Sequence, residues 1–101
     1  MDLIVGVTNC DSLVPMPVLA TFLGITVRVY FEDHAPPHVH VEYAEHRAIV
    51  DIATGRVLSG KLPPRCAKLF EEWRALRLAE LRRAWDAAQE SRIPRRIAPL
   101  A

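Results

Sequence analysis

Hydrophobic and polar residues alternate strictly in two stretches of the first half of the chain. Every second residue is apolar over residues 25–32, and the same alternation returns over residues 38–43. A period of two is typical of a strand with one buried and one solvated face. Two further apolar stretches, bounded by turn residues such as Gly55, complete the predicted sheet: residues 48–52 and 57–58. We expect an antiparallel meander of about four strands, with residues 3–7 as an additional N-terminal edge strand.

The period changes after Gly60. Pro63-Pro64 suits the start of a helix, and Pro94 ends the pattern. Between them apolar residues recur at spacings of three and four, which predicts one long amphipathic helix: Cys66, Leu69, Phe70, Trp73, Leu76, Leu81, Ala84, Trp85 and Ala88. The predicted fold is therefore α+β, with the helix packed on the apolar face of the sheet. We interpret residues 1–101 as a single domain with an N-terminal extension (1–15), a sheet half (16–60), a helix (61–93) and a tail (94–101).

Length, composition and charge narrow the class of protein. A chain of 101 residues that is half hydrophobic suits one folded domain and excludes intrinsic disorder. The formal net charge of +1 excludes a protein that coats polyanions, but it conceals a net charge of −4 over residues 1–60 and of +5 over residues 61–101. The sequence has no apolar run long enough to cross a membrane and no signal sequence. We therefore expect a cytoplasmic protein that does not enter a membrane. Two cysteines 56 residues apart indicate reduced thiols rather than a disulfide framework.

All four histidines lie within thirteen residues, and two of them share one face of a predicted strand. His38 and His40 are two residues apart, about 7 Å between Cα atoms, and Glu42 continues the same face. Imidazole and carboxylate are ligands that Zn²⁺ and non-haem iron accept. One interpretation is therefore a divalent metal site at His34, His38, His40 and Glu42, with Asp33 as another residue that could complete the set, although the cofactor stays unknown.

Two other interpretations of the same histidines stay open. In the first, His38 and His40 act as general acid and base in a nuclease, metal-free or metal-assisted, with Glu80 or Glu42 orienting them and Arg77 holding phosphate. In the second, they are only the polar side of a strand or contact a partner. Arg77 and Glu80 lie inside the apolar stripe of the helix, and at this spacing they can also pair with each other.

The C-terminal part of the chain is rich in arginine. After residue 60 there are eight arginines and two lysines, a bias that suits forked contacts with phosphate or carboxylate. Acidic residues interleave along the helix, so much of this charge is expected on a solvated, salt-bridged face. Arg92, Arg95 and Arg96 are the least balanced group and the candidate contact for phosphate or an acidic partner.

The stretch YFEDHAPPHVHVEY at residues 30–43, with Trp73, Glu80-Leu81 and Trp85 in the predicted helix, forms a distinctive set, and its part DHAPPHVHVEY (residues 33–43) is the most specific. From Met16 to Leu100 the chain resembles one bacterial family, that of domain of unknown function 4160. Family members tend to begin at the equivalent of Met16. They also tend to have His or Asn followed by Arg where this chain has Arg77-Leu78, which weakens a role for a helix histidine.

The resemblance implies a small cytoplasmic bacterial protein with strands first and helix last. It also implies a component of toxin–antitoxin-type gene pairs, beside a partner from the domain of unknown function 2442 family, but no established activity. We therefore expect a toxin–antitoxin-type or accessory module that acts through a protein partner, which the opposite charges of the two halves also favour. A homo-oligomer and a nucleic-acid partner stay open.

Overall fold

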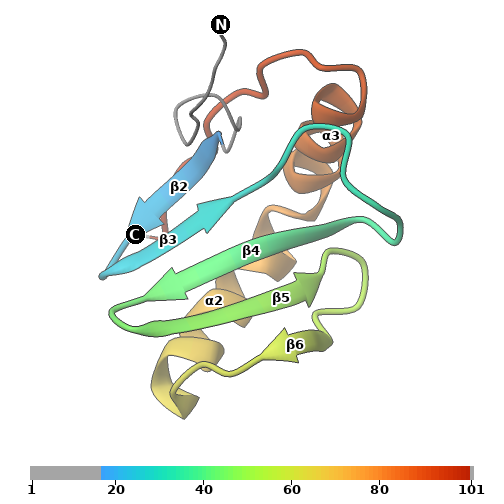
Figure 1. Ribbon diagram of the computed structural model, residues 1–101. Coiled ribbons are helices and arrows are strands. Elements are labelled where there is room, and N and C mark those ends of the chain that lie inside the picture. Colours follow the sequence, from blue (N-terminus) through green and yellow to red (C-terminus); the bar gives the residue numbers. More distant parts are fainter. Residues whose placement is uncertain (1–16, 101) are drawn as a thin grey trace, which may run out of the picture.

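The computed structural model describes residues 17–100, which form an antiparallel sheet followed by two helices (Figure 1). The strands pair in chain order, each with the next: β2 (Val18–Phe22), β3 (Ile25–Arg28), β4 (His38–Tyr43), β5 (His46–Asp51) and β6 (Val57–Gly60). The predicted α+β meander is confirmed, with five strands in the described residues where about four were expected. The additional strand expected at residues 3–7 and the extension at 1–15 lie outside the described residues.

The helical part is divided in two where the sequence predicts one long helix. α2 (Pro64–Leu76) and α3 (Leu78–Gln89) meet at Arg77, whose φ of −110° and ψ of 22° depart from helical values. The Arg77 N–H still donates to the Trp73 carbonyl oxygen, and the Arg77 carbonyl accepts from the Leu81 N–H, both at 2.9 Å. The bend lets α2 lie behind the sheet while α3 turns toward the end of the sheet where β4 begins (Figure 1).

The core lies between the sheet and the helices. The alternating residues of the strands are almost fully buried, with Ile25, Val27, Val39 and Val41 all at 0% exposure. They belong to one hydrophobic cluster with the helix residues Phe70, Trp73, Leu81, Ala84, Trp85 and Ala88. One face of the sheet is therefore committed to the core, and among the described residues no helix covers the other face (Figure 1).

The tail after α3 returns across the molecule and is held to it. The Ile97 N–H donates to the Leu19 carbonyl oxygen of β2 at 2.7 Å, and the Trp73 indole N–H donates to the Ala98 carbonyl oxygen at 2.8 Å. The Ile97 side chain is 5% exposed. Within residues 17–100, neither helix has the length and apolar character required to cross a membrane.

Candidate functional site

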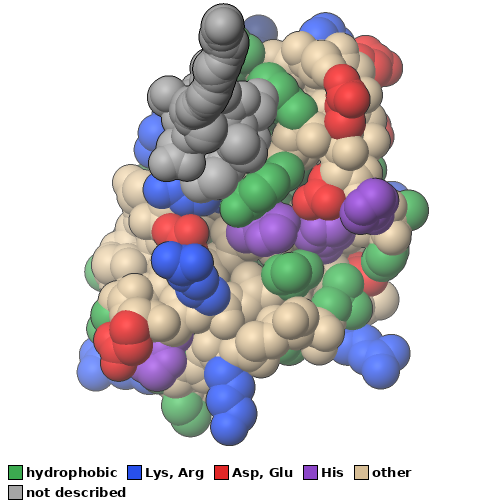
Figure 2. Space-filling view, in the orientation of Figure 1, with side chains coloured by type: hydrophobic (Ala, Val, Ile, Leu, Met, Phe, Trp, Pro, Cys, Tyr) green, Lys and Arg blue, Asp and Glu red, His purple; other side chains and the backbone are tan. Residues whose placement is uncertain are grey.

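Strand β4 presents His38 and His40 on the side opposite its core residues. Val39 and Val41 point into the core, so the intervening residues face the other way. The two imidazole rings lie 5.2 Å apart between centroids. Histidine side chains gather on the open face of the sheet, next to an acidic side chain (Figure 2).

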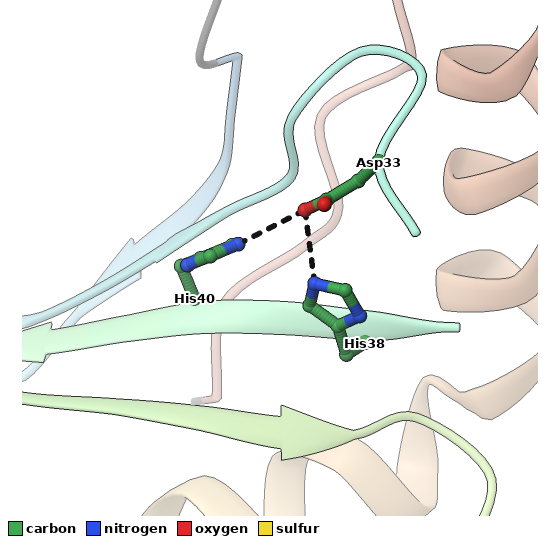
Figure 3. A group of neighbouring side chains, drawn as sticks. All are labelled: Asp33, His38 and His40. Atoms are coloured by element: carbon green, nitrogen blue, oxygen red, sulfur yellow. Dashed lines mark hydrogen bonds and ion pairs between the residues drawn. The ribbon is translucent and has the colours of Figure 1, made fainter. Parts of the chain in front are cut away.

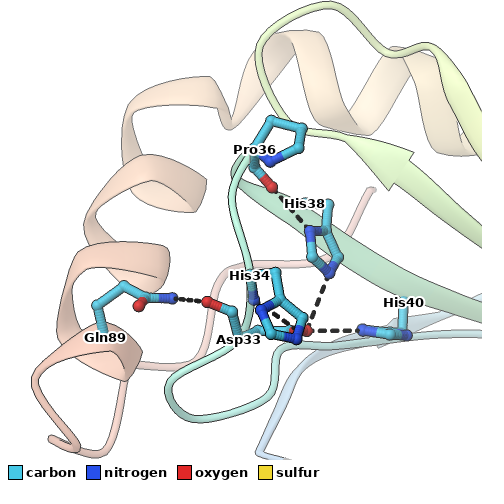
Figure 4. A network of polar contacts seen from close by, with 6 residues as sticks. All are labelled: Asp33, His34, Pro36, His38, His40 and Gln89. Carbon is cyan, nitrogen blue, oxygen red and sulfur yellow. Dashed lines mark hydrogen bonds and ion pairs between the residues drawn. The ribbon is translucent and has the colours of Figure 1, made fainter.

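A loop from β3 to β4 brings Asp33 back over this pair. Glu32 adopts a left-handed φ of 52°, and its N–H donates to the Ala88 carbonyl oxygen at 3.1 Å. The Gln89 side-chain amide donates to the Asp33 backbone carbonyl at 3.1 Å (Figure 4). The Ser91 hydroxyl donates to the Glu32 carboxylate. The end of α3 thus fixes the position of the loop, and with it the position of the Asp33 side chain.

One carboxylate oxygen of Asp33 faces both histidines (Figure 3). Asp33 Oδ2 lies 2.9 Å from His38 Nε2 and 3.3 Å from His40 Nε2. The other oxygen, Oδ1, accepts the His34 backbone N–H at 2.8 Å. One ligand atom from each of Asp33, His38 and His40 lies within 4.8 Å of the others, so these three residues could hold a metal ion. We call them the Asp33 triad.

The hydrogen bond of His38 Nδ1 determines whether His38 Nε2 carries a hydrogen or a lone pair. His38 Nδ1 lies 2.7 Å from the Pro36 carbonyl oxygen, which can only accept, so Nδ1 carries a proton and donates it (Figure 4). In the neutral imidazole, Nε2 then has a lone pair and no hydrogen. That lone pair would face the Asp33 carboxylate at 2.9 Å, a contact that is favourable only with a proton or another cation between the two atoms.

The Asp33 carboxyl is kept ionised by its neighbours. Burial would raise its pKa, but the His34 N–H, the hydrogen bond with His40 and the interactions with His38 together outweigh burial and lower the pKa. The site therefore has a carboxylate at neutral pH.

Aromatic rings and a small cavity surround the triad. Tyr30 lies over His40, with ring centroids 4.2 Å apart, and Trp85 lies 5.2 Å from the His38 ring. The side chain of His38 is 10% exposed and that of His40 is 21% exposed. His40 and Tyr30 also line a cavity of about 260 Å³ on the open face, together with Glu42, Arg47 and Ser59. A small molecule can therefore reach His40 from solvent.

The structure brings together only some of the expected metal ligands. His38 and His40 adjoin Asp33, whereas His34 contributes its backbone N–H, and its ring is not in the triad. Glu42 is paired with Arg28, at 3.4 Å between Oε1 and Nε. The carboxylate beside His38 and His40 is therefore that of Asp33, which the sequence indicates as another possible ligand.

The residues expected to assist catalysis lie elsewhere. Arg77 and Glu80 pair with each other at 3.3 Å, one of the two arrangements expected from their spacing. Among the described residues, no hydrogen bond or ion pair joins either of them to His38 or His40. Arg92, Arg95 and Arg96 line a separate cavity with Glu80 and Arg83.

Sequence reasoning missed the residues that position the triad. The Pro36 carbonyl and the Gln89 amide have no pattern that would identify them, because one is a backbone atom and the other lies 56 residues from its partner. The one signal in the sequence is the pair Pro36-Pro37, which restricts the backbone directly before His38.

The family model of the domain of unknown function 4160 matches residues 24–86, well over half of the chain. The chain belongs to this family. The matched region contains the whole Asp33 triad and Trp85, but it ends before Gln89 and the tail arginines. A search of the curated proteins and a search of the solved structures gave no match.

Proposed function

We propose that the Asp33 triad is a binding centre for a divalent transition metal, Zn²⁺ or Fe²⁺. The observation that carries the proposal is the position of His38, whose Nε2 lies 2.9 Å from the Asp33 carboxylate while Nδ1–H is donated to the Pro36 carbonyl. With Nδ1–H held in this way, Nε2 faces the carboxylate favourably when a proton or a metal ion lies between the two atoms. Metal-bound histidines commonly donate the other ring N–H to a carbonyl in this way, which fixes the tautomer.

The distances within the triad support this assignment. Two ligands of a tetrahedral zinc ion, each about 2.1 Å from the metal, lie about 3.4 Å apart. Asp33 Oδ2 is 2.9 Å from one imidazole nitrogen and 3.3 Å from the other, so small side-chain shifts suffice to admit an ion. Two histidines and one carboxylate leave at least one coordination position open to water or a substrate.

In such a centre each residue of the chain has a definite task. His38 and His40 supply neutral nitrogen ligands, and Asp33 supplies charge that offsets part of the metal charge. A metal bound in this way would polarise a substrate oxygen or activate a water molecule. The cavity beside His40 gives that substrate a place, with Arg47 as a positive charge on its wall.

The test is the metal content of the full chain purified without a histidine tag. We expect close to one equivalent of zinc or iron per chain by elemental analysis, and less than about a tenth of an equivalent in Asp33→Ala or His40→Ala. His46→Ala is the matched control, because His46 lies on β5 and pairs with Glu45 outside the triad. Wild-type protein without metal, which also fails to take up added Zn²⁺ or Fe²⁺, would overturn the proposal.

A second candidate function is nuclease activity, which is favoured by the contact between the Asp33 carboxylate and the His38 imidazole. An ionised Asp33 facing an imidazole is the arrangement that orients a histidine for general acid and base catalysis. In this scheme Asp33 takes the orienting role that was expected of Glu80 or Glu42. RNA cleavage, or toxicity on expression, should be lost in His40→Ala and kept in His46→Ala, and equal activity in both variants would exclude it.

The role as a toxin–antitoxin-type or accessory module stays a prediction from the family resemblance. It requires a specific protein partner, for which the product of the neighbouring gene is the first candidate. A pull-down from the native operon that returns no such partner would count against it.

A further inference from the structure

Four arginines surround one cavity between α3 and the C-terminal tail. Arg83 of α3 and three tail residues, Arg92, Arg95 and Arg96, line a space of about 540 Å³. This volume lies within the range of small-molecule sites. Glu80 is the one carboxylate among the lining residues, so the wall of the cavity is strongly positive.

Most of this positive charge has no partner within the described residues. Glu80 pairs with Arg77, outside the set of arginines, and Arg92 pairs with Glu90 at 2.7 Å. Within residues 17–100, the side chains of Arg83, Arg95 and Arg96 form no ion pair and no hydrogen bond. Guanidinium groups gathered on one cavity repel one another, and an anion placed between them relieves that repulsion.

The backbone that carries these arginines is fixed. The Arg92 N–H donates to the Ala87 carbonyl oxygen at 2.9 Å, which turns the chain back along α3. Pro94 and Ile97 are buried, and Ile97 is also bonded to β2. Arg95 and Arg96 lie between these two anchors, so a ligand would not have to order the tail when it binds.

We propose that this cavity binds a multiply charged phosphate group, either the diphosphate of a free nucleotide or the phosphodiester backbone of a nucleic acid. Each guanidinium offers parallel N–H donors that match two oxygens, and several such groups need more oxygens than a single carboxylate supplies. A diphosphate has enough oxygens to accept hydrogen bonds from several guanidinium groups, and enough negative charge to offset theirs. The proposal does not depend on a metal at the Asp33 triad, whose residues are absent from the lining of this cavity.

The test is calorimetric titration of the full chain with pyrophosphate, in metal-free buffer so that the Asp33 triad cannot contribute through a bound ion. We expect saturable binding that weakens as salt is added. Arg83→Ala and Arg96→Ala should each weaken the affinity by about ten-fold or more, the usual effect of losing a charged hydrogen bond. Arg82→Ala is the matched control, because this exposed neighbour on α3 has the same charge but does not line the cavity.

A parallel titration with a short single-stranded oligonucleotide distinguishes the two sources of phosphate. Binding of pyrophosphate that depends on Arg83 supports a nucleotide ligand. Binding of the oligonucleotide alone, with the same dependence, supports a nucleic-acid backbone. The proposal is overturned if neither probe binds, or if Arg82→Ala weakens binding as much as Arg83→Ala, because the effect would then be diffuse attraction. Thermal unfolding verifies that each variant is folded.

Discussion

A single backbone carbonyl, that of Pro36, gives His38 its chemical role. Because this carbonyl accepts a hydrogen bond from Nδ1–H, only Nε2 can contact Asp33 or bind a metal. The loop contact and the ligand contact therefore use different atoms of one side chain, and a suitable substitution can separate them. Asparagine has an amide N–H close to the position of Nδ1 but nothing at the position of Nε2.

His38→Asn should therefore keep the loop and lose the metal. We expect its thermal stability without metal to exceed that of His38→Ala, because the amide can still donate to the Pro36 carbonyl. Its metal content should fall to the level of Asp33→Ala. Elemental analysis and thermal unfolding measure the two effects separately. If His38→Asn retained wild-type metal content, His38 would not be a ligand.

A side chain at Gly55 would displace the ion pair of Glu71 and Arg74. The φ of Gly55 is +78°, and an added Cβ would clash with Glu71 Oε1 and lie 2.6 Å from Arg74 Nε. Gly55→Ala should lower the free energy of unfolding by about 2 kcal/mol or more, from the left-handed backbone and the displaced ion pair. Gly24→Ala has a similar φ of +85° but meets only the edge of the Tyr43 ring, at 3.0 Å. Chemical denaturation should find Gly24→Ala less destabilised than Gly55→Ala. The reverse order would mean that displacement of the ion pair of Glu71 and Arg74 does not determine the loss of stability.

At the scale of elements, Arg74 joins α2 to the turn between β5 and β6. Its guanidinium donates to both carboxylate oxygens of Glu71, and Nη1 also donates to the Ile52 carbonyl oxygen at 2.8 Å. The Arg74 residue is 7% exposed, so this charge is buried and needs its partners. The hydrogen bond from Arg74 lowers the pKa of Glu71, against a smaller opposing effect of burial.

This pair predicts how acid affects the docking of α2. The Glu71 pKa is below its ordinary value of 4.5 in the folded chain, so its contribution to stability is present above pH 4.5 and is lost as the pH falls through the lowered pKa. Glu71→Gln should therefore be less stable than wild type at pH 7, and the difference should shrink toward pH 3. Urea unfolding at both pH values measures it. Glu72→Gln, at an exposed neighbouring position, should show a much smaller pH-dependent difference, and equal effects would refute a specific pair.

The bend between α2 and α3 was not predictable from the apolar pattern. Arg77 is neither glycine nor proline, and although the apolar spacing widens to five residues between Leu76 and Leu81, the same stripe resumes after it, so the sequence indicates one helix. Tertiary contacts decide the bend, because α3 packs Trp85 near His38 and bonds through Ala88 and Gln89 to the loop before β4. Strands β3 and β4 were predictable because alternation is a local property.

At the scale of the whole molecule, some features of the site follow from neighbouring residues in the sequence, and others depend on contacts between distant segments. The positions of His38 and His40 on one face follow from the period of a strand. The selection of Asp33 over His34 and Glu42 depends on a loop held by the end of α3, more than fifty residues away. A single sequence could therefore list the candidate ligands but could not choose among them.

The C-terminal tail is bonded to β2, and its contribution to the free energy of unfolding can be measured. Ile97 is 5% exposed and Ile93, four residues earlier, is 83% exposed. Removing buried methylene groups costs transfer free energy and leaves a cavity, so Ile97→Ala should lower the free energy of unfolding by about 2–4 kcal/mol. Ile93→Ala should change it by less than about 0.5 kcal/mol. Chemical denaturation followed by tryptophan fluorescence suits the test, because Trp73 bonds to Ala98. Equal stability of the two variants would mean that the tail is not part of the folded core.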